Sequence, residues 1–361
     1  MTRQTTLAWF WLTVGWWLCP ALPVQAALVS EVEPPPVSSA VEAEQAVLKA
    51  LDRTFCAPDQ TFPQSPTWIA QPIRPDRWGQ GGDLVIMLDQ QIHQLLLPAI
   101  TRYAHAKQLD IRVREGTCGT SAGLISRKAV DIAGFCCPPG KSDRLPGLTF
   151  HTLGIASIAI LLHPENPIGD LTVPQLKEIF MGQPRQWSQI SDRSGQIGPA
   201  WDILPIGRLH CKLRPGHWRA LLPDPDDFSP RMEEVVTIPD MLQRILAQRG
   251  SIGYETLWHV ERFRQNGRAK PVALNGIALN GIAPNDVAAL TEGRYPLYHV
   301  FNVTIWEGEG VVNPRARELV DHLDQAIAAM DPSLTMIPAS TLRHAGWLFR
   351  GEELIGEPER P

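Results

Sequence analysis

Short apolar runs and amphipathic stretches alternate between residues 84 and 134, and this alternation constrains the fold more than any other feature of the chain. The run Leu84–Leu88 is continuous and apolar, which is typical of a buried strand. Residues 92–106 carry apolar side chains at helical spacing, and residues 110–114 and 130–134 again have the pattern of strands. Strands that alternate with helices usually form a parallel sheet, so the sequence predicts an α/β fold.

The first 26 residues have the pattern of a secretory signal peptide. Arg3 precedes the apolar run Leu7–Leu18, and the segment ends in Val24-Gln25-Ala26, where small residues suit a signal peptidase. The apolar run is shorter than the roughly 20 residues of a membrane span. We therefore expect residues 1–26 to be cleaved and the mature chain to be soluble and periplasmic.

Composition narrows the classes of protein to which the chain could belong. The 33 Lys and Arg residues against 38 Asp and Glu residues give a formal charge of -5, which excludes a generally basic nucleic-acid binder. Residues 27–80 are rich in Pro, Ser, Glu and Gln and are expected to form an N-terminal extension rather than a domain. No nucleic-acid partner is predicted.

The number of cysteines in the mature chain bears on how many disulfides it can form. Removal of the signal peptide takes Cys19 with it and leaves five cysteines: Cys56, Cys118, Cys136, Cys137 and Cys211. Disulfides are the default expectation for cysteines in an oxidising compartment. Because five is an odd number, at least one cysteine is a free thiol, binds a ligand or pairs with another chain.

The segment 171–182 carries a complete set of helix signals. Thr172 and Gln175 have the spacing of a capping box, Pro174 lies in the first turn, and Gly182 ends the segment. A helix is therefore predicted here with defined ends.

A tandem repeat follows later in the chain. Leu274-Asn275-Gly276-Ile277-Ala278 is repeated at once as Leu279-Asn280-Gly281-Ile282-Ala283. A single extra copy does not make a solenoid. We expect it to be a small insertion in a surface loop, where added length is tolerated.

Five segments of the chain match one known family in the same order. The predicted helix and Trp187 fit the pattern L-T-x-x-Q-L-x-x-I-F-x-G-x-x-x-x-W. The other four segments are Val130-Asp131-Ile132, Asn166-Pro167, Ser251-Ile252-Gly253-Tyr254 and Tyr295-Pro296-Leu297. In these segments the chain resembles the phosphate-type periplasmic solute-binding proteins, which are the substrate-binding components of ABC importers.

The resemblance implies the type II periplasmic binding protein fold, with two α/β lobes joined by two crossover strands. The crossover strands would lie near residues 155–162 and 250–254. One lobe would combine residues 81–160 with 256–350, and the other would comprise residues 161–255. The ligand would occupy the cleft between the lobes, and the lobes would close on it by a hinge motion.

The resemblance also implies which residues bind the ligand. Members of the family hold a small oxyanion with backbone N–H groups at helix N-termini, with hydroxyl groups and with one arginine, and each of these groups suits an oxyanion. On this sequence the corresponding residues are Thr117, Cys118, Gly119, Thr120, Ser121, Cys136 and Arg208. The implied partners are a small anion and either the permease of an ABC importer or a sensor kinase, and the chain is expected to be a monomer.

Two departures from the family pattern bear on the ligand. Cys136 stands where phosphate-specific members carry the aspartate that accepts a proton from the ligand, and a thiol is a weak acceptor. The Ser-Gly-Thr turn that follows the family's arginine is absent, and residues 211–218 read Cys-Lys-Leu-Arg-Pro-Gly-His-Trp. Phosphate itself is therefore questionable as the ligand.

The cysteines near the expected cleft leave further alternatives open. Cys118 could form a disulfide with Cys136 or Cys137. Alternatively, Cys118, Cys136, Cys137 and Cys211 could bind a thiophilic ligand such as arsenite or a soft metal ion. A cysteine-dependent enzyme is a third alternative, but no catalytic signature surrounds any of these residues. We therefore expect a binding protein without enzymatic activity and without a cofactor.

Overall fold

The computed structural model describes residues 55, 61–209, 217–265, 276–279, 281–308 and 311–358. All of them fall within one compact unit, residues 50–361. The predicted signal peptide, Cys56 and Cys211 lie outside the described residues. Within the ranges that are described, no helix is both long enough and apolar enough to cross a membrane.

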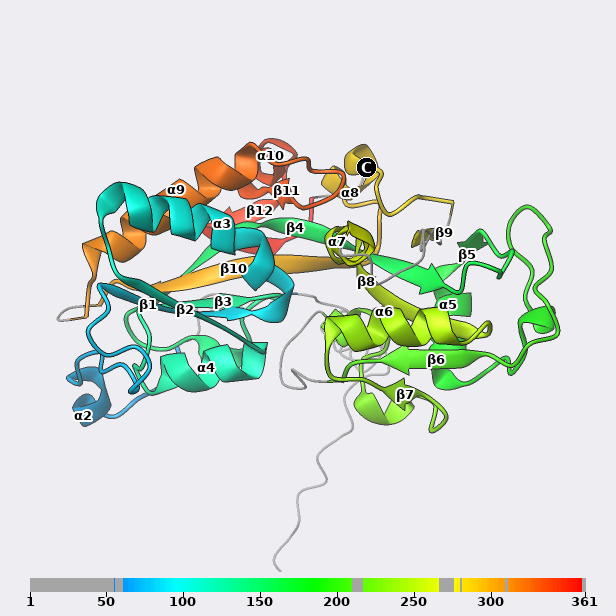
Figure 1. Ribbon diagram of the computed structural model, residues 1–361, viewed down its shortest axis with the longest axis horizontal. Helices are drawn as coiled ribbons and strands as arrows, with labels where there is room; N and C mark the ends of the chain where they lie inside the picture. Colours follow the sequence, from blue (N-terminus) through cyan, green and yellow to red (C-terminus); the bar gives the residue numbers. More distant parts are fainter. Residues whose placement is uncertain are drawn as a thin grey trace, which may run out of the picture. The chain divides into compact units, whose positions relative to one another are not determined.

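Three parallel strands begin the described sheet. They are β1 (Leu84–Asp89), β2 (Ile111–Gly116) and β3 (Ile132–Phe135), and β1 lies between the other two. The helices α3 (Gln90–Lys107) and α4 (Cys118–Ser126) lie on opposite faces of these strands (Figure 1). All six residues of β1 are buried, because both faces of the strand are covered. The three strands and the helix predicted between residues 84 and 134 are confirmed, and α4 is an additional helix.

A 15-residue strand, β4 (Leu148–Leu162), connects two groups of strands. Its first part runs antiparallel to β10 (Tyr298–Trp306), and its last part runs antiparallel to β8 (Ser251–Thr256). Beyond β8 the sheet continues in parallel through β6 (Leu204–Gly207) to β7 (Glu233–Glu234), giving the order β2-β1-β3-β10-β4-β8-β6-β7. The α/β fold is confirmed, but the prediction of a parallel sheet is wrong at β10, β4 and β8. A continuous apolar run indicates a buried strand and carries no information about its direction.

Buried side chains form two hydrophobic cores. The first core draws on residues 84–156 and 301–336, and the second core draws on residues 155–300 and 337–354. Strand β4 contributes side chains to both cores. The bounds of two separate lobes stay a prediction.

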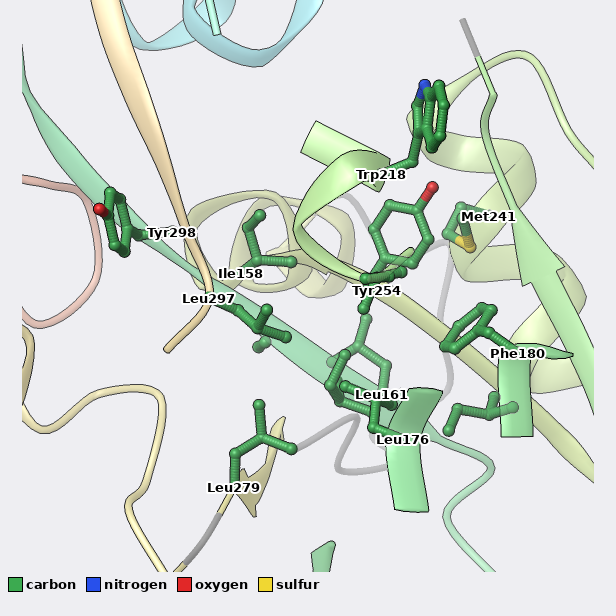
Figure 2. Close-up of a cluster of buried hydrophobic side chains, with 14 of the residues drawn as sticks. Ile158, Leu161, Leu176, Phe180, Trp218, Met241, Tyr254, Leu279, Leu297 and Tyr298 are labelled. Atoms are coloured by element: carbon green, nitrogen blue, oxygen red, sulfur yellow. The ribbon is translucent and has the colours of Figure 1, made fainter. Parts of the chain in front are cut away.

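The second core contains the aromatic residues that the family pattern includes. Trp187 of the pattern is completely buried in it, as is Trp218, which lies outside the pattern. Figure 2 shows Phe180 and Met241 beside Tyr254, and the rings of Phe180 and Tyr254 meet edge to face at 6.1 Å. Figure 2 thus illustrates how the helix that matches the family pattern packs against β8.

The remaining described elements complete the two cores. The helices are α6 (Ile238–Ala247), α7 (Leu257–Gln265), α8 (Val287–Thr291), α9 (Pro314–Ala328) and α10 (Ala339–His344), and the strands are β5 (Asp170–Leu171), β11 (Ile337–Pro338), β12 (Leu348–Arg350) and β13 (Glu353–Gly356). Short 3-10 turns lie at Lys141–Asp143, Trp187–Gln189, His217–Ala220 and Pro225–Asp227.

Helix α5 (Val173–Met181) has the ends that the sequence predicts. The N–H of Gln175 donates to Thr172 Oγ1 at 3.2 Å, and the N–H of Thr172 donates to Gln175 Oε1 at 2.8 Å. Gly182 follows with a φ of 92°, a left-handed conformation that glycine adopts without steric cost. The predicted capping box and glycine stop are confirmed.

The first copy of the tandem repeat contributes a strand, so the prediction of a surface loop is wrong there, whereas Gly281 and Ala283 of the second copy are exposed. Residues Gly276–Leu279 form β9, which pairs with β4 at Ile160 and with β5 at Asp170. Leu279 is completely buried. The unpaired edge of β4 offers backbone groups that an added strand can bond to, and this outweighs the turn-like Asn-Gly composition of the repeat.

The last part of the predicted N-terminal extension packs on the first core. It contains the short helix α2 (Pro66–Ile69). Lys128 donates from Nζ to the carbonyl oxygen of Ile69 at 2.8 Å and to that of Gln71 at 2.7 Å. The same ammonium group lies 4.4 Å from the centre of the Trp68 ring, within the range of a cation–π contact. A buried lysine thus holds this segment in place.

We predict that Lys128→Met loosens the segment around α2. The change removes the donor for two carbonyl groups, and losing such bonds costs about 1–3 kcal/mol of local stability. Trypsin should therefore cut after the exposed Arg77 about tenfold faster, because cleavage follows local opening. Mass spectrometry of the released peptides measures the rate. Lys141→Met, at an exposed position, is the control. Equal cleavage rates in the two variants would refute the role of Lys128.

Candidate functional site

Three cysteine thiols meet where β2 and β3 end. Cys118 opens α4, and Cys136 and Cys137 directly follow β3. Cys118 Sγ lies 3.2 Å from Cys136 Sγ and 3.9 Å from Cys137 Sγ, and all three sulfur atoms lie within 4.8 Å of one another. All three side chains are buried. The structure therefore brings together three of the four cysteines that the sequence groups, and the fourth, Cys211, lies outside the described residues.

No disulfide joins any two of these three cysteines, so the expected bond from Cys118 to Cys136 or Cys137 is absent from the structure. The sulfur–sulfur distances of 3.2 and 3.9 Å are far longer than the roughly 2.05 Å of a covalent bond. Cys118 Sγ instead accepts a hydrogen bond from the N–H of Cys136 at 3.3 Å.

Asp89 lies next to the thiols and was missed in the sequence analysis. It ends β1 and caps α3, where its Oδ1 accepts from the N–H of Gln91 at 2.8 Å. The side chain is completely buried, and its Oδ2 has no hydrogen-bond partner among the described residues. Burial raises the pKa of Asp89, although the Gln91 N–H, the Cys118 and Cys136 thiols and the charge of Arg208 oppose that shift. An aspartate directly after a buried apolar run was the signal that could have identified it.

A buried ion pair faces this group from the second core. Arg208 follows β6, and its Nη2 donates to Glu255 Oε2 of β8 at 2.7 Å, with both side chains fully excluded from water. Burial alone would raise the pKa of Glu255, but the Arg208 guanidinium, assisted by His259, holds it below its usual range. Nε and Nη1 of Arg208 have no hydrogen-bond partner among the described residues. The guanidinium therefore has donors left for a ligand.

Two buried histidines border the ion pair and the thiols. His259 Nδ1 lies 2.7 Å from Thr256 Oγ1, and His299 Nδ1 lies 3.1 Å from the carbonyl oxygen of Cys136. Burial lowers the pKa of both rings, to about 4 for His299. Both histidines are therefore neutral at pH 7, and the ionisable groups that decide the local charge are Asp89, Arg208 and Glu255.

The other predicted ligand residues lie along the first turn of α4. Thr117 caps the helix, and its Oγ1 accepts from the N–H of Thr120 at 3.2 Å. Ser121 is buried with Oγ 3.5 Å from the carbonyl oxygen of Met87, whereas Gly119 and Thr120 are exposed. Of the seven predicted residues, Cys118, Cys136 and Arg208 thus belong to the buried group around Asp89.

A pocket of about 410 Å³ opens beside this group. Its lining residues are Gln90, Gln94, Glu115, Thr237, Ile238, Pro239, Leu242, His259, Arg262 and Phe263. Gln90 is the neighbour of Asp89 in the chain, and His259 Nδ1 lies 3.6 Å from Glu255 Oε1. The pocket therefore shares one wall with the ion pair and begins at the helix that Asp89 caps.

We predict that Glu255→Gln lowers the free energy of unfolding by about 3–5 kcal/mol, because it leaves the buried Arg208 charge unpaired. Urea unfolding at pH 7 measures the loss. Glu292→Gln is the control, since Glu292 is exposed and pairs with Arg294 at the surface, and it should cost no more than about 1 kcal/mol.

Comparison of the wild type with Glu255→Gln at different pH values tests the lowered pKa of Glu255. Since that pKa lies below the ordinary value of 4.5, the carboxylate stabilises the fold above pH 4.5, and this contribution disappears as the pH falls through the lowered pKa. The stability difference between wild type and Glu255→Gln should therefore shrink in acid. A difference that is constant down to the acid unfolding transition would contradict the assignment.

Comparisons with known proteins agree with this architecture. An ABC-type phosphate transport receptor from Vibrio cholerae aligns with a TM-score of 0.56 and 16% sequence identity, over 71% of this chain and 100% of its own. A putative phosphate ABC transporter substrate-binding protein with bound phosphate from Clostridium perfringens aligns with a TM-score of 0.57 and 15% sequence identity, over 71% of this chain and 99% of its own. No family model matches the chain.

One curated protein matches part of the sequence. A stretch of 119 residues, 32% of this chain, is 24% identical to the phosphate-binding protein PstS of Bacillus subtilis (strain 168) and spans 40% of that protein. The chain therefore has the type II periplasmic binding protein fold, and its predicted resemblance to the phosphate-type substrate-binding proteins is confirmed.

Proposed function

We propose that this chain is an extracytoplasmic solute-binding protein that captures a small oxyacid between its lobes for an ABC-type importer. The observation that carries the proposal is the fully buried Arg208 guanidinium, two of whose nitrogen atoms have no partner among the described residues. Leaving buried donors unsatisfied is costly, and a ligand oxygen that accepts from them removes that cost. The planar fork of arginine is suited to such oxygen atoms.

The charges around Arg208 favour a ligand that keeps protons. Oδ2 of Asp89 has no hydrogen-bond partner among the described residues, the carboxyl group is close enough for the Arg208 charge to act on it, and Glu255 already occupies one side of the guanidinium. A fully ionised phosphate would bring further negative charge toward two carboxyl groups in a dry environment. A protonated oxyacid can instead donate from an O–H group to Asp89 while its other oxygen atoms accept from Arg208.

Binding without catalysis is the better explanation of the cysteines. Hydrogen bonding with Cys118 and Cys137, together with burial, raises the pKa of the Cys136 thiol well above its ordinary value. A thiol that stays protonated at neutral pH is a poor nucleophile. A cysteine-dependent enzyme is therefore not favoured. Import rather than sensing is proposed because the two solved relatives are named as ABC transport components.

Calorimetry with a panel of oxyacids tests the proposal. The panel comprises phosphate, arsenate, arsenite, sulfate, molybdate and tungstate, and the protein is the chain without residues 1–26. We expect at least one member to bind with 1:1 stoichiometry. Absence of binding by every member would overturn the proposed function.

A double variant tests the role of Arg208. Arg208→Met combined with Glu255→Gln removes both buried charges together, so no unpaired charge is left in the core. The affinity for the ligand, measured by the same calorimetry, should fall at least about tenfold, since hydrogen bonds to charged groups contribute about 1.5–3 kcal/mol. Arg185→Met, at an exposed position, should capture ligand like the wild type. Unchanged capture by the double variant would exclude Arg208 from the binding site.

A further inference from the structure

We propose that Cys118, Cys136 and Cys137 bind the central atom of a trivalent thiophilic oxyacid, for which arsenous acid is the simplest probe. The inference rests on the proposed solute-binding function and names the ligand class of the same site. Arg208 and Asp89 would hold the oxygen atoms of the incoming oxyacid. The three sulfur atoms would then replace these oxygen atoms on the central atom.

The positions of the sulfur atoms support a shared ligand. The three atoms come from two separate segments, the first residue of α4 and the two residues after β3, yet all lie within 4.8 Å of one another, so that one atom placed among them can contact all three. Packing alone does not require three thiols at one point, because any small apolar side chain would fill the same volume. Thiolates are the ligands preferred by soft, thiophilic elements.

Burial decides which oxidation state suits the site. Three thiolates carry three negative charges, so a monovalent ion would leave a net charge of −2, a divalent ion −1 and a trivalent centre none. The cysteines are 0–1% exposed, and the nearby Asp89 is 0% exposed, so excess negative charge would have no water to stabilise it. A trivalent centre therefore fits this environment better than copper(I) or zinc(II).

The binding step balances without any oxidant or reductant. Arsenous acid, As(OH)₃, condenses with three thiols: three As–O bonds and three S–H bonds break, three As–S bonds form, and three water molecules leave. The arsenic atom stays trivalent, and each hydroxyl group takes the proton of the thiol that replaces it. Neutral reactants give neutral products, which is compatible with a buried site.

Native mass spectrometry of the full mature chain tests this inference. The protein is reduced with a phosphine in the absence of oxygen and then incubated with arsenite. We expect a mass increase of one arsenic atom less three hydrogen atoms. Cys136→Ser and, separately, Cys137→Ser should each weaken arsenite binding at least tenfold.

A matched control separates loss of the site from loss of the fold. Thr304→Val changes a buried residue of β10 whose Oγ1 donates to the carbonyl oxygen of Ala133 in β3 at 3.3 Å, and it should bind arsenite like the wild type. Thermal unfolding of every variant confirms that it is folded, and if Cys136→Ser does not fold, Cys137→Ser carries the test.

The possible failures can be distinguished from one another. Arsenite bound with its oxygen atoms retained, or phosphate binding without arsenite binding, would overturn the thiol site and leave the proposed function standing. Copper(I) or zinc(II) that loads the thiols and is not displaced by arsenite would overturn the trivalent class. Binding of no panel member at all would overturn both proposals.

Discussion

Backbone pairing along β4 is the constraint on which the rest of the described structure depends. A buried strand must bond its N–H and C=O groups to neighbouring strands, since no water reaches them. Over residues 148–157 β4 satisfies this requirement with β10, and over residues 158–162 it does so with β8, with β9 and β11 adding further pairs. One strand thereby fixes the register of the strands that line both hydrophobic cores.

The candidate site is a consequence of that arrangement. Asp89, the three thiols and Arg208 all lie at or directly after the carboxyl ends of their strands, where ligands bind in open α/β sheets. Glu255 is brought to Arg208 because β8 and β6 are parallel neighbours. The result is a group of polar side chains that is dry, nearly balanced in charge and incompletely hydrogen-bonded. Such a group is costly for a fold to maintain unless it binds something.

Local signals in the sequence predicted local structure well. The capping box of Thr172 and Gln175 and the stop at Gly182 needed only neighbouring residues, and the structure has them in place. Strand direction and the pairing of β9 depend on distant parts of the chain. This explains why the predictions of a parallel sheet and of a surface loop at residues 276–279 were wrong. Docking of residues 61–80 depends likewise on Lys128, whose partners lie almost 60 positions away.

Only part of the candidate site was predicted, because the site too depends on contacts between distant residues. Cys118, Cys136 and Arg208 could be identified because the family pattern marks their positions. Glu255 could not, since nothing in its immediate neighbours distinguishes a buried acid that faces a ligand from a surface one. Asp89 carried one signal, its position directly after a buried apolar run, which marks the end of a strand but not a partner. Their roles become visible only when burial and the unsatisfied atoms Asp89 Oδ2 and Arg208 Nε are seen together.

X-ray absorption at the arsenic edge is the most direct test of a solute held among these thiols. The sample is the reduced mature chain loaded with one equivalent of arsenite and freed of excess ligand. The account predicts a single shell of three sulfur neighbours and no oxygen neighbour around a trivalent arsenic atom. A shell of oxygen atoms, or arsenic that washes away before measurement, would contradict it.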